Sequence, residues 1–235
     1  MLNRLKKEIE EAKNPEQAKI LQRFFKTGKG EYGEGDIFLG IKVPIQRKIA
    51  KGYTNLSFMD LQTLLNSKIH EERLIALIIL TNKYQKSKKD FVKKRQIFEF
   101  YLKNTHNINN WDLVDLSAPN IVGDFSSTDG TEVIRFLAKS KNLWERRIAI
   151  VSTYAFIKKR IFGETLAIAD MLLKDEHDLI HKAVGWMLRE VGKRNQEVLE
   201  IFLKERYKTM PRTMLRYSIE KFPEEKRKAY LKGEI

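Results

Sequence analysis

The sequence is poor in the residues that cross-link or stiffen a chain. It contains no cysteine and only 5 prolines in 235 residues. The absence of cysteine excludes disulfides and thiolate metal sites and is typical of a reducing compartment. The longest aliphatic run, from Leu74 to Leu80, is far too short to span a membrane, and the charged N-terminus lacks the apolar region of a signal peptide. We therefore expect a cytoplasmic protein without a membrane anchor.

Common catalytic motifs are also missing. The sequence has no HExxH, GxSxG or Walker pattern, which excludes the commoner metalloprotease, hydrolase and P-loop classes. His177 and His181 are spaced for a shared metal ion, but no third ligand is evident. His70 and His106 fall at corresponding places between earlier helices, so a structural role at helix junctions is the better interpretation. Any chemistry must therefore depend on few residues.

Positive charge is abundant. Lys and Arg number 45 against 31 Asp and Glu, giving a formal net charge of +14. Such a balance indicates a polyanionic partner: DNA, RNA or an anionic membrane surface. A membrane surface would require a concentrated basic amphipathic helix, whereas these cations are distributed along the chain. A nucleic acid is therefore the expected partner, and we expect a monomer.

Apolar residues recur at three- and four-residue spacing, which predicts helices almost everywhere. Residues 71–86 are the clearest case, with Leu74, Leu77, Ile78 and Thr81 on one face and Glu71, Glu72 and Arg73 at the start. The other helices are expected at residues 2–13, 15–27, 43–52, 57–66, 89–104, 110–122, 130–140, 143–159, 162–174, 178–194, 195–207, 210–221 and 223–232.

Two columns of residues repeat along the chain with a similar period. Helix ends are marked by Leu65, Leu102, Leu137, Leu172 and Leu203, at spacings of 37, 35, 35 and 31. Starts of the following helices are marked by Arg73, Asp112, Arg146, Lys182 and Arg212, at spacings of 39, 34, 36 and 30. This period predicts an all-α, HEAT-like solenoid of antiparallel helix pairs forming one domain over residues 1–235. The alternative is an irregular helical bundle whose spacings agree by chance.

Stacked pairs produce a curved array, and the second column should line its concave side. These helices carry many cations, so we expect a basic concave face that binds phosphates. The alternative is a solvated basic face without a ligand. The expected phosphate ligands are Arg73, Arg146, Arg147, Lys182, Arg189, Arg212 and Arg216.

A glycine-rich break, TGKGEYGEGDI at residues 27–37, separates the second helix from the stretch FLGIKVPIQRK. It predicts a flexible loop, and a loop facing nucleic acid is one interpretation. It contains no nucleotide-binding fingerprint.

Trp111 and Asp115 lie four residues apart in NNWDLVDLSAPNIVG, so a helix would present an indole and a carboxylate on one face. Aspartate is a poor residue for a helix interior, and Asp112 already complements the helix dipole. A functional carboxylate is one interpretation of Asp115. The other is a salt bridge to an arginine of a neighbouring repeat, with Trp111 in the core.

Later repeats add Trp144 and Arg147 in NLWERRIAI and Trp186 in KAVGWMLRE. A carboxylate, an arginine and indole rings in a basic groove suit a positively charged base lesion. Indole faces attract cations, a carboxylate stabilises positive charge that develops on the sugar, and arginine holds a flanking phosphate.

Four stretches together resemble the AlkD-type DNA alkylation repair family of HEAT-like DNA glycosylases, in the same order and over nearly the whole chain: FLGIKVPIQRKIAK, NNWDLVDLSAPNIVG, NLWERRIAIV and HKAVGWMLREVGKRN. The resemblance implies hydrolysis of the N-glycosidic bond of cationic alkylpurines such as 3-methyladenine and 7-methylguanine in duplex DNA, without a cofactor. It places the catalytic aspartate at Asp115, the cleft tryptophans at Trp111 and Trp186, and the cleft arginine at Arg147.

One position departs from the family. Where such enzymes can present a tyrosine from the second helix, this sequence has Phe24 in QRFFK. The aromatic face is kept but the hydroxyl is lost, so packing against DNA is expected and a hydrogen bond is not. Two other functions stay open: a non-catalytic repeat scaffold that binds DNA, RNA or protein, and a hydrolase with an unrecognised site.

Overall fold

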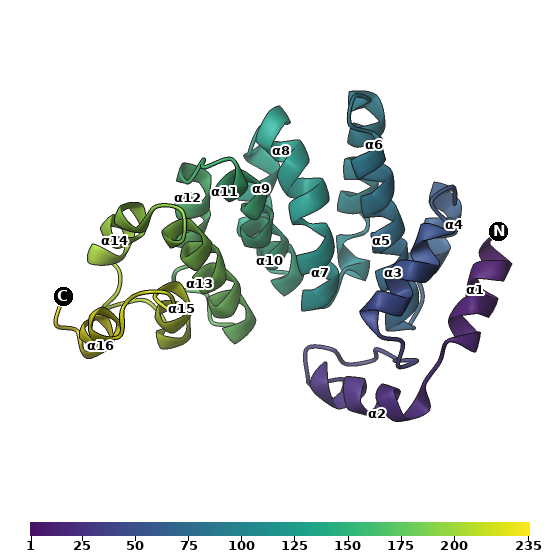
Figure 1. Cartoon of the computed structure of the whole chain (residues 1–235), viewed down its shortest axis with the longest axis horizontal. Helices are drawn as coiled ribbons and strands as arrows, with labels where there is room; N and C mark the ends of the chain where they lie inside the picture. The colour runs from purple at the N-terminus through teal and green to yellow at the C-terminus, as the bar shows by residue number, and fades with distance from the viewer. The chain divides into compact units, whose positions relative to one another are not determined.

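The computed structural model describes residues 1–235, and the chain forms helices with no β-strand (Figure 1). The first half contains α1 (Leu2–Glu11), α2 (Pro15–Phe24), α3 (Val43–Lys51), α4 (Phe58–Leu65), α5 (His70–Lys86), α6 (Phe91–Lys103) and α7 (Trp111–Ser117). The second half contains α8 (Asp124–Asp129), α9 (Glu132–Ala138), α10 (Leu143–Ser152), α11 (Tyr154–Lys158), α12 (Gly163–Met171), α13 (Asp178–Gly192), α14 (Gln196–Lys204), α15 (Arg212–Ser218) and α16 (Glu224–Lys232). None of these helices combines the length and apolar character of a membrane span.

The repeat leucines mark the pairs correctly. Leu65 is the last residue of α4, and Leu137 and Leu203 lie within the last turns of α9 and α14. The resulting pairs are α4 with α5, α9 with α10, and α12 with α13, each joined by direct contact. The prediction of an all-α fold of helical repeats is therefore confirmed.

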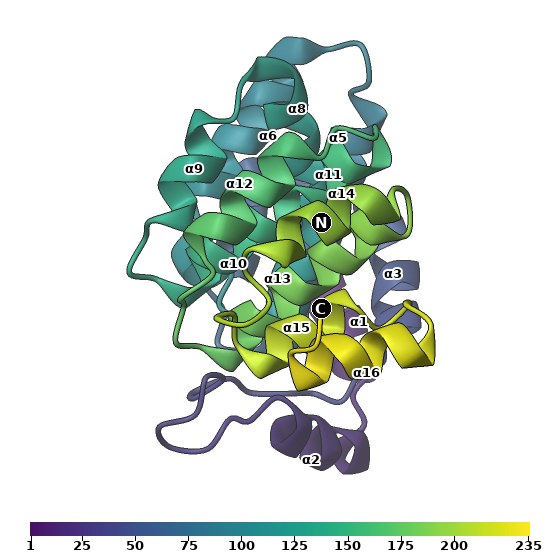
Figure 2. The same ribbon diagram turned by 90° about the vertical axis from the view of Figure 1, so that its left-hand side faces the viewer.

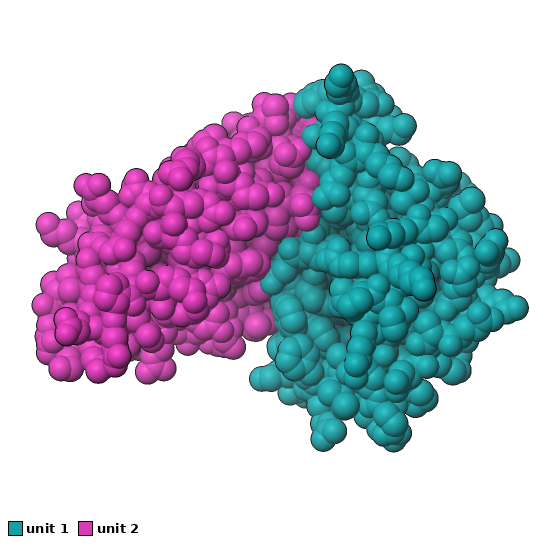
Figure 3. All heavy atoms as spheres, in the orientation of Figure 1, with its two compact units in different colours: residues 1–117 teal, residues 118–235 magenta.

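The chain divides into two compact units, residues 1–117 and 118–235, which Figure 3 shows in different colours. In the first unit, α5 contacts α3, α4, α6 and α7. In the second unit, α13 contacts α10, α12, α14 and α15, and α10 packs on α9 (Figures 1 and 2). Each unit thus surrounds one long second-column helix with its neighbours.

Helix α5 differs from the expectation of one apolar face, because it is buried along nearly its whole circumference. Even Glu71 is fully buried, and its carboxylate accepts hydrogen bonds from the backbone N–H groups of Leu39, Gly40 and Ile41 at 2.8–3.2 Å. A buried carboxylate is stable when backbone donors satisfy it. Glu71 therefore anchors the segment before α3, a role that its place at a helix start did not indicate.

Two other departures from the expected helices have local causes. The segment expected as one helix over 110–122 changes after α7 into a π-helical turn, Pro119–Gly123, because Pro119 has no N–H to continue the α-helical pattern. The segment expected over 143–159 is interrupted at Thr153, whose hydroxyl donates to the carbonyl of Ile150 at 2.7 Å. The helix over 124–129 was not predicted.

Gly185 sets the packing of α13 on α15. A Cβ atom at this position would lie 2.5 Å from the Cβ of Tyr217 and 2.6 Å from the carbonyl oxygen of Met214. Only a residue without a side chain permits such a close approach. The glycine next to Trp186 therefore fixes how the helix that carries the tryptophan is seated.

Candidate functional site

The candidate residues divide between the two units. Phe24, Trp111 and Asp115 belong to residues 1–117, whereas Arg147 and Trp186 belong to residues 118–235. In the first unit, Trp111 opens α7 and Asp115 follows one turn later, and both side chains are partly exposed. Asn110 begins this helix, because its buried side-chain oxygen accepts the N–H of Trp111 at 2.8 Å. Trp111 and Asp115 therefore lie on one helix, as predicted.

A stack of rings fixes the orientation of Trp111. Its indole lies parallel to Phe25, with ring centroids 5.1 Å apart and planes inclined by 17°. Phe25 stacks in turn on Phe38 at 4.9 Å, and Phe38 stacks on His70 at 4.4 Å. Such stacked rings restrict the rotation of one another in addition to burying apolar area. The indole of Trp111 is therefore held from one side by three further rings.

Phe24 completes this cluster from α2. Its ring meets Trp111 edge to face, with centroids 5.9 Å apart and planes at 75°, and the side chain is 60% exposed. The departure from tyrosine at this position thus leaves an exposed aromatic ring beside the candidate tryptophan. The structure thus brings Phe24 and Trp111 into contact, which the sequence had not indicated.

Behind the rings, His70 bridges two carboxylates. Its Nε2 lies 2.8 Å from Asp112 Oδ2 and its Nδ1 lies 3.1 Å from Asp36 Oδ2. Burial alone would lower the pKa of His70, but Asp112 and Asp36 outweigh burial and raise it to about 9. The ring is therefore a cation at neutral pH, and it ties the first turn of α7 to the loop that contains Asp36.

Arg73 belongs to the same network. Its Nη2 donates to Asp36 Oδ1 at 2.7 Å and its Nη1 donates to the carbonyl of Ser67 at 2.8 Å, with the side chain only 4% exposed. Burial would raise the pKa of Asp36, but His70 and Arg73 together lower it. The prediction that Arg73 lines a phosphate-binding face is wrong, because this guanidinium is buried and neutralises an aspartate.

In the second unit, Arg147 links two helices. It lies on α10, is 5% exposed, and donates from Nη1 to the carbonyl of Leu179 at 2.6 Å. Leu179 is in the first turn of α13, the helix that carries Trp186. Arg147 therefore ties the start of α13 to α10, while its predicted contact with a phosphate stays a prediction. Trp144, three residues earlier, is buried.

Lys182, Trp186 and Arg189 follow one another at helical spacing along one face of α13. Trp186 is half-buried, and its ring centroid lies 6.3 Å from that of Tyr154. Lys182 pairs with Asp178 at 2.7 Å, and Arg189 pairs with Glu220. A phosphate would have to compete with these carboxylates for both cations.

Arg146 is held more firmly still. Its Nε donates to Asp175 at 2.6 Å, its Nη1 donates to the carbonyls of Ser140 and Lys141, and the side chain is 19% exposed. Arg212, another expected phosphate ligand, donates to the carbonyl of Leu231 at 2.8 Å. All of the cations that the sequence assigned to phosphates, except the exposed Arg216, thus have partners inside the protein.

The histidine pair of α13 has structural contacts. His177 caps α13 by accepting the N–H of Leu179 at 3.1 Å, and His181 contacts the carbonyl of Asp175. No group of three or more His, Cys, Asp and Glu side chains within residues 1–235 is arranged to hold a metal ion. These contacts agree with a junction role for both residues.

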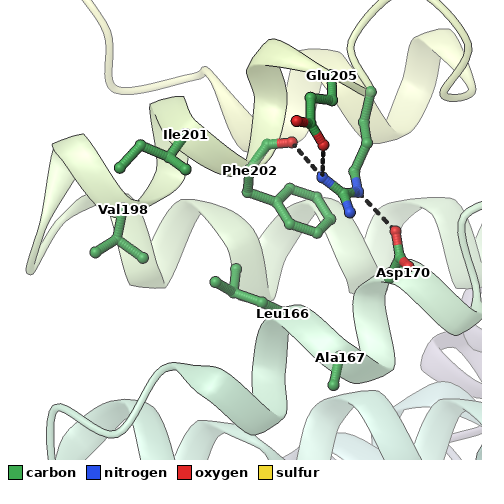
Figure 4. Close-up of a pocket in the computed structure, with 8 residues that line it drawn as sticks. Leu166, Ala167, Asp170, Val198, Ile201, Phe202 and Glu205 are labelled. Carbon is green, nitrogen blue, oxygen red and sulfur yellow. Dashed lines mark hydrogen bonds and ion pairs between the residues drawn. The ribbon is translucent and has the colours of Figure 1, made fainter.

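A pocket of about 420 Å³ lies between α12 and α14, away from every candidate residue (Figure 4). Leu166, Ile201 and Phe202 supply its apolar lining, and Arg206 donates from Nε to Asp170 at 2.6 Å beside it. Both carboxylates in this lining, Asp170 and Glu205, contact Arg206, and no candidate residue lines the pocket, so we do not include it in the candidate site.

Sequence reasoning missed the residues that support the two tryptophans. Phe25, Phe38 and the pair of Asp36 and His70 stand behind Trp111, and Tyr154 stands beside Trp186. The adjacent phenylalanines in QRFFK were a signal, since one ring of two neighbours on a helix end can face inward while the other stays exposed.

Comparison with known proteins identifies the chain. The family model described as DNA alkylation repair enzyme matches residues 5–222. The chain belongs to this family. Solved structures similar to the chain include a predicted DNA alkylation repair enzyme from Enterococcus faecalis, with a TM-score of 0.68 and 19% identity over 90% of this chain and 97% of that one. AlkD2 from Streptococcus mutans has a TM-score of 0.57 and 18% identity, covering 89% of this chain and 98% of its own.

At 19% and 18% sequence identity, these two structural similarities show a shared fold and no more. No curated protein gives a significant match to the chain. Membership of the DNA alkylation repair enzyme family therefore supports a role in the repair of alkylated DNA, and the identity of the lesion has to come from the site.

Proposed function

We propose that this protein is a DNA glycosylase that hydrolyses the N-glycosidic bond of cationic alkylated purines, such as 3-methyladenine and 7-methylguanine, in duplex DNA during base excision repair. One observation carries the proposal: a member of a DNA alkylation repair family presents Asp115 one helical turn from Trp111, and three stacked rings hold that indole.

The proposed reaction needs little assistance at the base. An alkylated purine cation leaves as a neutral base when the bond from its nitrogen to C1′ breaks, so no general acid is required. Positive charge then develops on the sugar, and the carboxylate of Asp115 stabilises it electrostatically. A water oxygen bonds to C1′ and releases a proton, which completes the hydrolysis.

The other candidate residues would hold the DNA. We assign Trp111 and Trp186 to the walls around the deoxyribose, Arg147 to a flanking phosphate, and Phe24 to packing against the duplex. These roles require the two compact units to act as one domain with a curved, basic inner face. The family match supports a single domain, since it runs from residue 5 to residue 222 across the boundary between the units.

The decisive experiment measures release of methylated base from alkylated duplex DNA in single turnover, with wild type beside Asp115→Asn. Asparagine keeps the shape of aspartate but removes its charge, so excision should slow by about 10² to 10³, the scale for loss of one preorganised electrostatic group. Glu99→Gln is the matched control, because it removes one exposed negative charge from α6 of the same unit. Excision by this control should equal that of wild type.

Binding to undamaged duplex gives a second readout. Affinity should fall with salt, by about 0.9 in log affinity per unit of log salt for each phosphate contacted. Asp115→Asn should bind duplex as tightly as wild type, or slightly more tightly. Normal excision by folded Asp115→Asn would overturn the proposed mechanism, and tight binding without base release by wild type would favour a repeat scaffold.

A further inference from the structure

The turn between α5 and α6 concentrates positive charge in the first unit. Between positions 83 and 95 the sequence has seven cationic side chains and one carboxylate, that of Asp90. The cations are Lys83, Lys86, Lys88, Lys89, Lys93, Lys94 and Arg95. Cations occur along the whole chain, but this short segment contains a large share of the net charge. A surface of this kind attracts a polyanion.

Three of these lysines line one pocket. The pocket has a volume of about 440 Å³ and is formed by the end of α5, the start of α6 and residues 54–58, with Lys83, Lys86 and Lys93 in its wall. Lys83 Nζ donates to the carbonyl oxygen of Thr54 at 2.9 Å, and Lys86 Nζ donates to the hydroxyl of the same residue at 3.3 Å. Two ammonium groups are therefore gathered at one point of the pocket.

These ammonium groups are not ion-paired, although Asp90 lines the same pocket. Lys83, Lys86 and Lys93 form no ion pair, in contrast to Arg73, Arg146 and Arg189, which each contact a carboxylate. The nearby Asp90 caps α6 by accepting the N–H of Lys93 at 2.9 Å. Burial lowers the pKa of Lys83, and the charges of Lys93 and Lys86 lower it further. An anion in the pocket would relieve this repulsion.

We propose that this lysine pocket binds a phosphodiester of the DNA backbone at a distance from the excised nucleotide. Each ammonium offers up to three donors, which suits an anion with several acceptor oxygens. His70, which contacts the first turn of α7, and Lys83 are thirteen residues apart on α5, so about 20 Å separates the pocket from the candidate site at a rise of 1.5 Å per residue. The proposal rests on the proposed function, because that function supplies the duplex.

The test compares two double variants with the same change in charge. Lys83→Gln/Lys86→Gln removes two ammonium groups from the pocket wall, whereas Lys88→Gln/Lys89→Gln removes two from the same turn outside the wall. Affinity for a long undamaged duplex is measured over a range of salt concentrations. The pocket variant should lower the slope of log affinity against log salt by about 0.9, the value for one lost phosphate, and the control variant should lower it by less than half of that.

Thermal melting confirms that both variants fold, and single-turnover excision by the control variant should match wild type. If both double variants gave the same slope of log affinity against log salt, or if the pocket variant kept the wild-type slope, the proposed phosphodiester contact at the lysine pocket would be wrong. Titration of wild type with inorganic phosphate separates the sources of the anion. Binding of inorganic phosphate by the pocket, combined with an unchanged DNA slope in the pocket variant, would identify a free phosphate ligand and overturn the DNA assignment.

The two proposals fail in different ways. A chain that binds duplex through this pocket but releases no methylated base would overturn the glycosylase and leave the pocket assignment standing. A chain that excises normally while the pocket variant keeps the wild-type slope would overturn the pocket alone. A chain that binds no duplex would overturn both.

Discussion

Helices α7 and α13 each present a candidate tryptophan, but they are held by different means. Trp111 on α7 rests on two stacked phenylalanine rings and a buried histidine, and this histidine joins two aspartates. Trp186 on α13 lies beside Tyr154, between Lys182 and Arg189, which have partly exposed ion partners. The comparison indicates that a buried network of ion pairs positions the first helix. The second is positioned by close packing at Gly185, by ion pairs near water, and by the buried Arg147, which donates to a backbone carbonyl rather than bridging carboxylates.

The energetic consequences differ because the dielectric surroundings differ. A buried charge whose partner is removed cannot be compensated by solvent, whereas water can replace the partner of a partly exposed cation. Charge changes in the buried network of Asp36, His70 and Arg73 should therefore affect folding more than changes in the partly exposed ion pairs of the second unit.

The largest expected effect is on the buried network. Asp36→Asn would leave the buried cations of Arg73 and His70 short of a counter-charge, so the free energy of unfolding should fall by about 3–5 kcal/mol. The matching change in the second unit, Asp175→Asn, removes the partner of the partly exposed Arg146 and should cost about 1–2 kcal/mol. Urea denaturation of both variants measures the difference. Equal losses would contradict the distinction between the two units.

The next effect concerns pH. The pKa of His70 is raised from 6.5 to about 9 by folding, so its contribution to stability is complete below about pH 6.5 and disappears as pH rises through 9. Wild type should therefore have a higher free energy of unfolding than His70→Gln. This margin should be largest at pH 6 and should shrink by up to about 3 kcal/mol by pH 9.5.

Denaturant titrations at both pH values measure this margin. The exposed His106 provides the control variant, His106→Gln, whose margin should not change in this way. A margin for His70→Gln that is independent of pH would show that the imidazole is neutral and that the link between α7 and the loop is not an ion pair.

These two predictions involve the part of the structure that sequence could not supply. The helix at 71–86 was predicted from apolar spacing and appears as His70–Lys86. The burial of Glu71 and Arg73 could not be predicted, because their partners, the amides of residues 39–41 and Asp36, come from a loop about thirty residues earlier. Local periodicity contains no information about such pairings, and charged residues at a helix start normally face water.

The candidate site shows the same limit. The spacing of Trp111 and Asp115 was sufficient to place both on one face of a helix, one turn apart. It could not show that Phe25 stacks on the indole while Phe24 stays exposed, because either residue of an adjacent pair could have faced inward. The high net charge was similarly misleading. It indicated that Arg146 and Arg189 are available to phosphates, although both have carboxylate partners.

A smaller effect tests that last point. Glu220→Gln should release Arg189 from its ion pair, so duplex affinity at low salt should rise by about twofold to fivefold, a change within the range of a partly exposed ion pair. Fluorescence anisotropy with undamaged duplex at two salt concentrations measures this. Because Glu220 also pairs with Lys221, the variant Lys221→Gln is the control. An increase that persists when Arg189 is also replaced by Gln would assign the effect to overall charge.

A change of similar size is expected at the exposed ring of the first unit. Phe24 touches Trp111 edge to face, and most of its surface is in solvent, so a tyrosine hydroxyl added at its far end would meet water rather than a buried surface. Phe24→Tyr should therefore excise 7-methylguanine within about threefold of the wild-type rate. Phe24→Ala removes an aromatic pair worth about 0.5–1.5 kcal/mol, so excision or duplex affinity should fall by about twofold to tenfold. Single-turnover rates and duplex affinities of both variants distinguish the ring from the hydroxyl. A rate gain above tenfold in Phe24→Tyr would mean that a hydrogen bond to DNA is missing at this position, and that packing of the ring on Trp111 is the lesser part of its role.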